Sequence, residues 1–184
     1  METIKAIARR KSVRAYKTEQ IPKEALARIL AAGCAAPVGA GMYNTLHLTV
    51  IQDKAVLGRL SDVCAQMLPD AAKEMIMAIT QGKLDPLYGA PAVVLISSTA
   101  SDVSGCVNAG CVAENMMLAA ADAGIGSVAL GGAGSAVMAD ARLKEMVSIP
   151  DGYNALFAVA LGYAAAEDAS EKDLKMTIGV HYIG

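Results

Sequence analysis

Two apolar runs of strand length constrain the fold of this chain more than any other feature of its sequence. The first, PAVVLISS, covers residues 91–98, and the second, YNALFAVALGY, covers residues 153–163. Neither run alternates between apolar and polar residues, so a strand made from either would present apolar side chains on both faces. We therefore expect both runs to lie inside a central sheet that has helices on each face.

Periodicity and capping residues predict the other elements. Further strands are expected at 45–52, 127–130 and 174–183, the last with alternating apolar residues. Helices are expected over 2–10, 21–37, the segment after the N-cap Asp53, about 69–80, 105–123 ending before Gly124, and 136–147 capped by Ser135. The pattern indicates an α+β fold with a mixed or antiparallel sheet of four to five strands flanked by helices. Residues 1–184 should form a single domain.

The apolar content of the chain points to a homodimer. With glycine counted and tyrosine left out, apolar residues make up about 60% of the sequence, compared with roughly 45–50% in an average protein. A monomer of this size has too little interior to bury that surplus. Glu114 and Asn115 lie within the longest apolar helix and need polar partners, which a dimer seam or a cofactor edge could supply.

Charge and hydropathy argue against several kinds of partner. A net charge of −2 does not suit nucleic acid as a general partner. The chain has no apolar run of signal-peptide type at its N-terminus and none of the roughly 18 residues that a membrane span requires, so we expect a soluble, cytoplasmic protein. The four cysteines show no C-x-x-C spacing and the two histidines lie in apolar runs, so no metal site is expected.

A basic cluster near the N-terminus is the clearest candidate binding site. Six of the 16 lysines and arginines lie within the first 17 residues, and the stretch RRKSVRAY at 9–16 adds a hydroxyl to them. The cluster could be a solvated helix end, which is the usual role of a short charged run. Guanidinium groups and a hydroxyl also bind small anions strongly. Because the chain as a whole is acidic, we expect any ligand of this cluster to be small.

Glycine-containing stretches bear on nucleotide binding. Residues 124–129, GIGSVA, match a dinucleotide fingerprint, which must follow a strand and open a helix. Here the stretch follows a predicted helix and enters a predicted strand, which argues against a Rossmann site. Glycines in the loops at 37–41 and 131–134 would let backbone amides approach a ligand closely, although ordinary turns would use them as well.

The ordered series of these segments resembles the nitroreductase family of flavoproteins over nearly the whole chain. The resemblance runs from RRKSVRAY through the helix that ends in Ala-Pro and the strand LHLTVI, then through GAPAVVLISS, AGCVAENMMLAAADAGIGS, FAVALGYAA and the closing VHYIG. It implies a nitroreductase-like homodimer that binds one FMN per subunit at the dimer interface. It also implies NADH or NADPH as a transient electron donor.

The resemblance implies which residues bind the flavin. Arg10, Lys11 and Ser12 match the segment that holds the phosphate, and either Lys172 or Lys175 would complete that site.

Other residues would approach the flavin ring. Arg14 is the candidate for a cation near N1 and O2 of the ring, and the segment Leu130, Gly131 and Gly132 for a backbone N–H aimed at N5. The loop after the Ala-Pro motif would also contribute, with Pro37, Val38, Gly39, Tyr43 and Asn44. No side chain is assigned as a catalytic acid or base.

Two departures from the family pattern affect the open face of the flavin. Val38 replaces the serine of the usual Ala-Pro-Ser, and the usual Asn-x-Gln-Pro-Trp is replaced by GMYNTL. The activity implied is a ping-pong transfer of hydride from NAD(P)H through FMN to an electron-poor small-molecule acceptor, such as a nitroaromatic compound or a quinone. An enzyme for a dedicated metabolite, a non-catalytic flavin carrier or sensor, and a basic docking patch without flavin are the alternatives.

Overall fold

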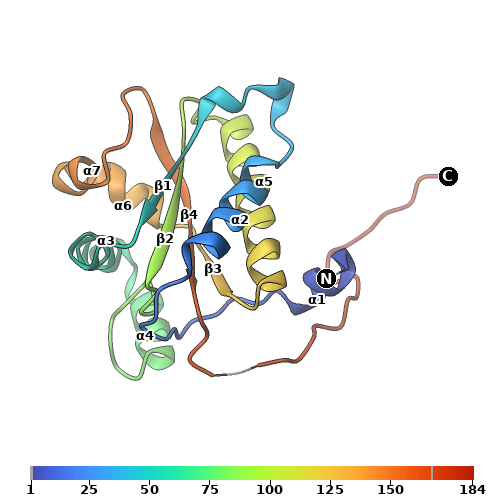
Figure 1. The fold of residues 1–184 in the computed structure, drawn as a ribbon, viewed down its shortest axis with the longest axis horizontal. Coiled ribbons are helices and arrows are strands. Elements are labelled where there is room, and N and C mark those ends of the chain that lie inside the picture. The colour runs from blue at the N-terminus through green and yellow to red at the C-terminus, as the bar shows by residue number, and fades with distance from the viewer. Residues whose placement is uncertain (1, 167) are drawn as a thin grey trace.

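A four-stranded antiparallel sheet forms the centre of the computed structural model, which describes residues 2–166 and 168–184 (Figure 1). Its strands lie in the order β1-β2-β4-β3. Their bounds are Leu46–Ile51 for β1, Ala92–Ser98 for β2, Gly126–Leu130 for β3 and Asn154–Gly162 for β4. The two apolar runs therefore supply the central strands, as their composition predicts, and β1 and β3 form the edges.

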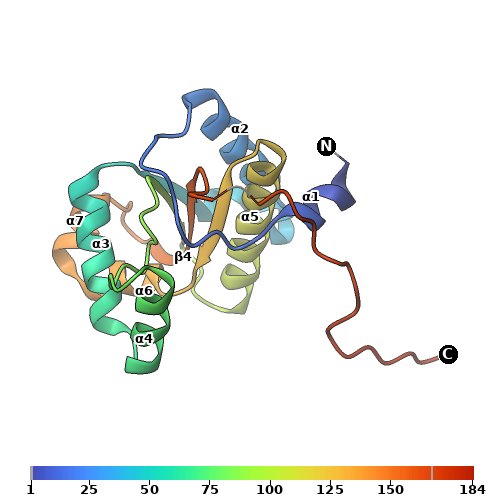
Figure 2. The ribbon, with the colours of Figure 1, turned by 90° about the horizontal axis from the view of Figure 1, so that it is seen from below.

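Helices cover both faces of this sheet, as expected. Figure 1 shows α2 and α5 on one side and α3, α6 and α7 on the other, and Figure 2 shows the same layers from below. The helices are α1 (Thr3–Arg9), α2 (Lys23–Cys34), α3 (Lys54–Met67), α4 (Asp70–Ile79), α5 (Val103–Asp122), α6 (Ala133–Ala139) and α7 (Ala141–Val147), with short 3₁₀ turns at Gly39–Gly41 and Tyr43–Thr45.

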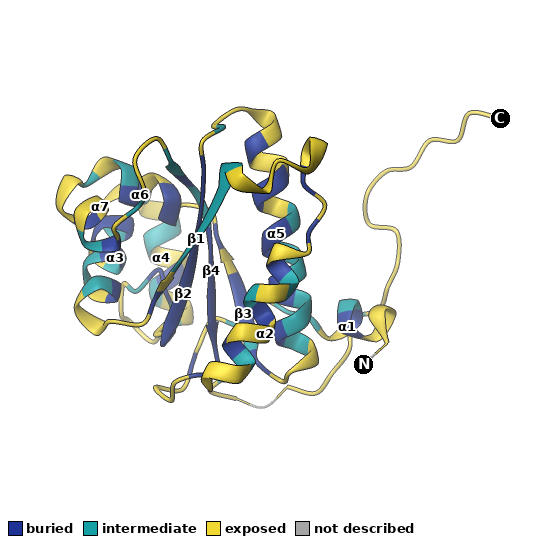
Figure 3. Cartoon of the chain, turned by 45° about the horizontal axis from the view of Figure 1, so that its top comes forward, coloured by how far each residue is buried: buried dark blue, intermediate teal, exposed yellow. Residues whose placement is uncertain are grey.

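The core is divided by the sheet into two clusters of buried side chains. Every residue of β2 is buried, and Figure 3 shows β2 and most of β4 in the colour of buried residues, whereas the edge strand β1 is mostly intermediate. Val93 and Leu95 face the α3 side, whereas Val94 and Ile96 face the α2 and α5 side. Successive strand residues thus contribute to opposite cores, which requires the continuous apolar run seen in the sequence.

Two of the predicted helix ends are confirmed. The Asp53 carboxylate caps α3 by accepting hydrogen bonds from the backbone N–H groups of Ala55 and Val56, at 2.8 and 3.0 Å. Gly124 follows α5 with a φ of 71°, the left-handed conformation that glycine adopts without strain.

The predicted helix over 136–147 is wrong in its start and in its continuity. It is two helices, broken at Asp140, and Ser135 lies inside α6 rather than capping it. Asp140 has an extended backbone, accepts a hydrogen bond from the N–H of Leu143 at 2.6 Å and forms an ion pair with Arg59 of α3. These contacts stabilise the charged form and lower the pKa of the Asp140 carboxyl. The break follows from a tertiary contact, which the local sequence does not reveal.

The predicted strand at 174–183 is also wrong for the single chain. This segment pairs with no strand among the described residues and extends away from the body of the protein (Figure 1). Its apolar side chains are exposed: Leu174, Met176, Ile178, Val180, Tyr182 and Ile183. The alternation is present, but the chain offers this segment no sheet edge. No helix in the described part of the chain is long and apolar enough to cross a membrane.

Close packing of α6 on β4 depends on Gly134. A Cβ atom at this position would lie 2.6 Å from the carbonyl carbon of Leu156 and 2.8 Å from the carbonyl oxygen of Ala155. Both are backbone atoms, so the helix itself would have to move.

We expect Gly134→Ala to lower the free energy of unfolding by about 1–3 kcal/mol. Gly58→Ala is the matched control, because a Cβ there meets nothing within 4 Å and alanine favours a helix interior, so it should add roughly 0.5–1 kcal/mol. Urea unfolding of both variants measures the difference. Equal stability of the two variants would show that α6 does not need close contact with β4.

Candidate functional site

A cavity of about 640 Å³ opens beside the N-terminal segment and the start of β3. The end of α5 and the chain after β4 complete its walls, which include Gly126, Ser127 and Tyr163. Five cationic side chains line it: Arg9, Arg10, Lys11, Arg14 and Lys17. A chain with a net charge of −2 therefore concentrates positive charge at one cavity.

Backbone hydrogen bonds fix the basic segment across one end of the sheet. The N–H of Val13 donates to the carbonyl oxygen of Ser127 at 2.9 Å, and the N–H of Lys17 donates to that of Tyr163 at 2.8 Å. A Cβ on Gly126 would lie 2.8 Å from Val13 Cγ2, so glycine is needed for this close approach. The second glycine of GIGSVA thus serves packing, and the stretch joins α5 to β3 as the sequence predicts.

Tyr16 anchors the same segment in the core. Its side chain packs in the cluster that contains Val93 and Leu95, and the residue is only 9% exposed. Burial raises the pKa of the Tyr16 phenol well above its usual range, and the nearby Arg14 guanidinium partly opposes this shift. The phenol therefore stays protonated. Its hydroxyl has no hydrogen-bond partner among the described residues.

Acidic residues pair with two of the cations. Arg10 Nε lies 3.4 Å from Glu114 Oε1 of α5, and Lys11 Nζ lies 2.7 Å from Asp168 Oδ2. The hydrogen bond from Lys11, together with those from Ser170, lowers the pKa of the Asp168 carboxyl. The partner of Glu114 thus lies in the same chain, and neither a dimer seam nor a cofactor is needed to supply it.

Of the two candidate C-terminal lysines, Lys172 lies beside the basic cluster and Lys175 does not. The backbone N–H of Lys172 donates to the carbonyl oxygen of Ala8 at 2.9 Å. Partial burial lowers the pKa of its ammonium group, and the charges of Arg10 and Lys11 lower it further. Lys175 lies on the exposed C-terminal segment, 3.9 Å from Asp173.

The loop that contains residues 37–44 lies near the other end of α5. Asn108, near the start of that helix, accepts a hydrogen bond from the N–H of Gly39 at 3.1 Å. The hydroxyl of Tyr153 donates to the carbonyl oxygen of Asn44 at 2.5 Å. Ala121, which lines the cationic cavity, is 13 residues further along the helix than Asn108, or about 20 Å. In the single chain, none of the residues 37–44 lines the cationic cavity.

The segment after β3 leaves backbone accessible at the edge of the sheet. Leu130 is buried, but Gly131 and Gly132 are exposed, and a Cβ on either would meet nothing within 4 Å. The four-residue step from Ser127 to Gly131 corresponds to about 13 Å of strand. An elongated ligand along this edge could reach from the basic cluster to these glycines.

The structure thus brings together the predicted residues Arg10, Lys11, Ser12, Arg14 and Lys172. It keeps apart from them the loop residues Pro37, Val38, Gly39, Tyr43 and Asn44, and it leaves Lys175 in solvent.

Sequence reasoning missed Asn108 and Asp168. The sequence does contain a signal for Asn108, because a polar residue within an apolar helix needs a hydrogen-bond partner. The sequence gives no corresponding signal for Asp168, whose contact with Lys11 spans 157 residues.

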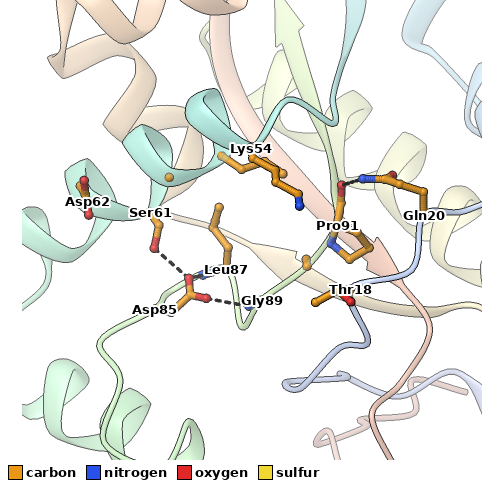
Figure 4. Close-up of a pocket in the computed structure, with 12 residues that line it drawn as sticks. Thr18, Gln20, Lys54, Ser61, Asp62, Asp85, Leu87, Gly89 and Pro91 are labelled. Carbon is orange, nitrogen blue, oxygen red and sulfur yellow. Dashed lines mark hydrogen bonds between the residues drawn. The ribbon is translucent and has the colours of Figure 1, made fainter.

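A second cavity, of about 330 Å³, lies between α3 and the loop before β2 (Figure 4). Its polar groups mainly support the backbone. Asp85 accepts hydrogen bonds from the hydroxyl of Ser61 at 2.8 Å and the N–H of Gly89 at 2.7 Å, and Gln20 donates to the carbonyl oxygen of Pro91. Lys54 is the only cationic side chain among the described residues that line it. The first cavity is therefore the candidate functional site.

Comparisons with known proteins agree with this architecture. A relative from Archaeoglobus fulgidus, whose name pairs NADH dehydrogenase with NAD(P)H nitroreductase, is 33% identical over 90% of this chain and 87% of its own. The crystal structure of a nitroreductase with bound FMN from Bacteroides fragilis is 28% identical, with a TM-score of 0.80 over 99% of this chain and 100% of that one. A nitroreductase from Desulfitobacterium hafniense, also with bound FMN, has the same fold at 24% identity, with a TM-score of 0.86 over 99% of this chain and 98% of that one.

The family assignment rests on most of the chain. A model of the nitroreductase family matches residues 7–163, which include the basic segment, all four strands and the glycines after β3. Together with the similarity to the archaeal relative, this match shows that the chain belongs to the nitroreductase family.

Proposed function

We propose that this protein is an FMN-dependent NAD(P)H oxidoreductase that reduces an electron-poor small molecule, such as a nitroaromatic compound or a quinone. The observation that carries the proposal is the cavity with five cationic side chains at the start of the edge strand β3. The FMN-bound structure from Bacteroides fragilis and the name of the archaeal relative support the cofactor and the donor.

The residues at the cavity fit a flavin phosphate. FMN carries a phosphate that is close to a dianion, and Arg10, Lys11 and Ser12 offer charged and hydroxyl donors within one short segment. Lys172 adds a partly buried ammonium group beside them. Lys11 and Arg10 each have an acidic partner in the chain, so a phosphate would share or replace those contacts.

The edge of β3 fits the rest of the cofactor. Ser12 pairs with Ser127 of β3. With the phosphate at Ser12, the flavin ring would lie toward Leu130, Gly131 and Gly132. The absence of side chains at the two glycines lets a backbone N–H approach the ring closely. We assign this segment to hold N5 of the flavin.

Bound FMN would supply the redox chemistry, accepting a hydride from NADH or NADPH and later passing it to the acceptor in a ping-pong sequence. The protein would bind, orient and tune the charge of the ring. Arg14 lines the same cavity as Arg10, and we assign it to the N1 and O2 side of the ring, where reduction adds negative charge. Hydride transfer needs no side-chain acid or base, and we assign none.

We also propose that the protein acts as a homodimer. The loop with Pro37, Val38, Gly39, Tyr43 and Asn44 does not line the cationic cavity of its own chain, so it would contribute to the site of a second copy. The backbone of 174–183 would pair with a sheet edge of that copy, and its exposed, alternating apolar side chains would be buried there.

The absorbance spectrum of the purified protein under nitrogen tests the proposed activity. A flavin spectrum that bleaches with NADH or NADPH and recovers with a quinone or nitroaromatic compound is the expected result. Bleaching without recovery by these acceptors would favour an enzyme for a dedicated metabolite. A flavin spectrum that does not bleach would favour a carrier or sensor, and no flavin binding after added FMN would favour a docking patch.

Arg10→Ala should weaken FMN binding by about 1.5–3 kcal/mol, because one charged hydrogen-bonding group is lost. The dissociation constant would rise roughly 10- to 150-fold. Arg142→Ala, on the exposed part of α7, is the control that removes an equal charge elsewhere. Fluorescence titration measures both constants, and unchanged affinity in Arg10→Ala would remove this residue from the site.

Arg14→Leu should slow flavin reduction by NAD(P)H more than it weakens FMN binding. A guanidinium near N1 and O2 stabilises the charge gained on reduction more than it stabilises the oxidised ring. Stopped-flow reduction and the midpoint potential of the FMN-loaded variant measure this effect, with Arg142→Leu as control. Wild-type values for both would show that Arg14 does not act at the ring.

Replacing Met176, Ile178 and Val180 together with serine should shift the protein from dimer to monomer at micromolar concentration, because the alternating face would lose its apolar surface. The matched control replaces Lys175, Thr177 and His181 with serine, because these residues would face the other way in a paired strand. Sedimentation velocity measures both. A folded wild-type monomer at that concentration would rule out the dimer.

A further inference from the structure

The side chain of Glu114 contacts Arg10 from the middle of the most apolar helix. Most neighbours of Glu114 on α5 are buried and apolar, among them Val112, Ala113 and Met116. The Glu114 carboxylate is 46% exposed and lies 3.4 Å from Arg10 Nε, whereas the Arg10 side chain is 24% exposed. Glu114 is the only acidic partner of Arg10 in ion pairs between described residues.

The atom that Glu114 contacts determines what Arg10 can still bind. A guanidinium has five N–H groups, of which Nε carries one and the two Nη atoms carry four. Engagement of Nε leaves both Nη atoms available, and these form a fork that matches two oxygens of a phosphate. The ion pair therefore holds the Nε side of the guanidinium near Glu114 without occupying its outer donors.

The backbone position of Arg10 is fixed separately. Arg10 follows the last residue of α1, and its N–H donates to the carbonyl oxygen of Ala6 at 2.9 Å. The last turn of α1 is also held by the N–H of Lys172, which donates to the carbonyl oxygen of Ala8. With the backbone held in this way, the contact with Glu114 is what selects one orientation of the long Arg10 side chain.

We propose that Glu114 is a positioning residue that orients Arg10 toward the phosphate of the cofactor. This inference rests on the proposed function, because it assigns the phosphate of FMN as the group that Arg10 meets. Glu114 itself does not contact the phosphate, since both are anionic.

Two effects of the carboxylate oppose each other, and they can be separated by substitution. Its negative charge repels a phosphate bound nearby, while its oxygen orients the guanidinium. Glutamine keeps an oxygen that can accept from Nε but carries no charge. Alanine removes both the oxygen and the charge.

We expect Glu114→Ala to raise the dissociation constant of FMN by about 3- to 10-fold, and Glu114→Gln to remain within about twofold of wild type. Riboflavin lacks the phosphate, so its affinity should be the same in all three proteins. Glu145→Ala, an exposed acid on α7, controls for the change in net charge. Fluorescence titrations of FMN and riboflavin at fixed ionic strength measure these constants.

Tighter FMN binding in Glu114→Ala would overturn the proposal, because it would mean that Glu114 only repels the phosphate. Unchanged FMN binding would also overturn it, because Glu114 would then have no role in binding the cofactor. An equal loss of FMN and riboflavin affinity would also overturn it, since that result indicates general loosening of the site. In parallel, thermal stabilisation by inorganic phosphate should be smaller in Glu114→Ala than in wild type. This second measurement tests the orientation of Arg10 even if the wild-type protein binds no flavin. Absence of flavin binding by wild type would reject the proposed function, but not the role of Glu114.

Discussion

Burial of β2 and β4 between two helical layers is the constraint on which the rest of this structure depends. Both central strands are apolar on both faces, so a strand moved out of this position would expose apolar side chains to water. The edges are therefore left to β1 and β3. Since the helices cover the faces, ligands and partners can reach the sheet only along those edges and at its ends. The candidate site and the unpaired C-terminal segment both follow from this arrangement.

The basic segment depends on the sheet in turn. A run of cations has no reason to adopt one conformation in water, because its members repel one another. Here Val13 ties the backbone between the cations to β3, and Lys17 ties it to the residue just after β4. The buried Tyr16 adds an apolar anchor. Free energy from core packing thus offsets the repulsion. The cations can then face one cavity without a ligand to hold them there.

Local patterns predict most of the fold but only part of the site. The buried strands, the Asp53 cap and the turn at Gly124 depend on residues that are close in sequence, so periodicity and capping rules reach them. The break at Asp140 depends on Arg59 of another helix, and the contact between Lys11 and Asp168 joins the two ends of the chain. Such contacts leave no periodic signal. The strand predicted at 174–183 differs again: its alternating pattern is present, but no strand among the described residues pairs with it.

The acids of the site explain how a chain can keep several cations together and still bind an anion. Glu114 and Asp168 each pair with one cation, which lowers the repulsion within the cluster before any ligand arrives. Both side chains remain substantially exposed, at 46% and 58%, so water screens the effect of the two carboxylates on an anion near the cations. Arg14 and Ser12 are exposed in the same cavity and have no acidic partner among the described ion pairs. The cluster is therefore partly compensated, at Arg10 and Lys11, and leaves Ser12 and Arg14 open to the cavity.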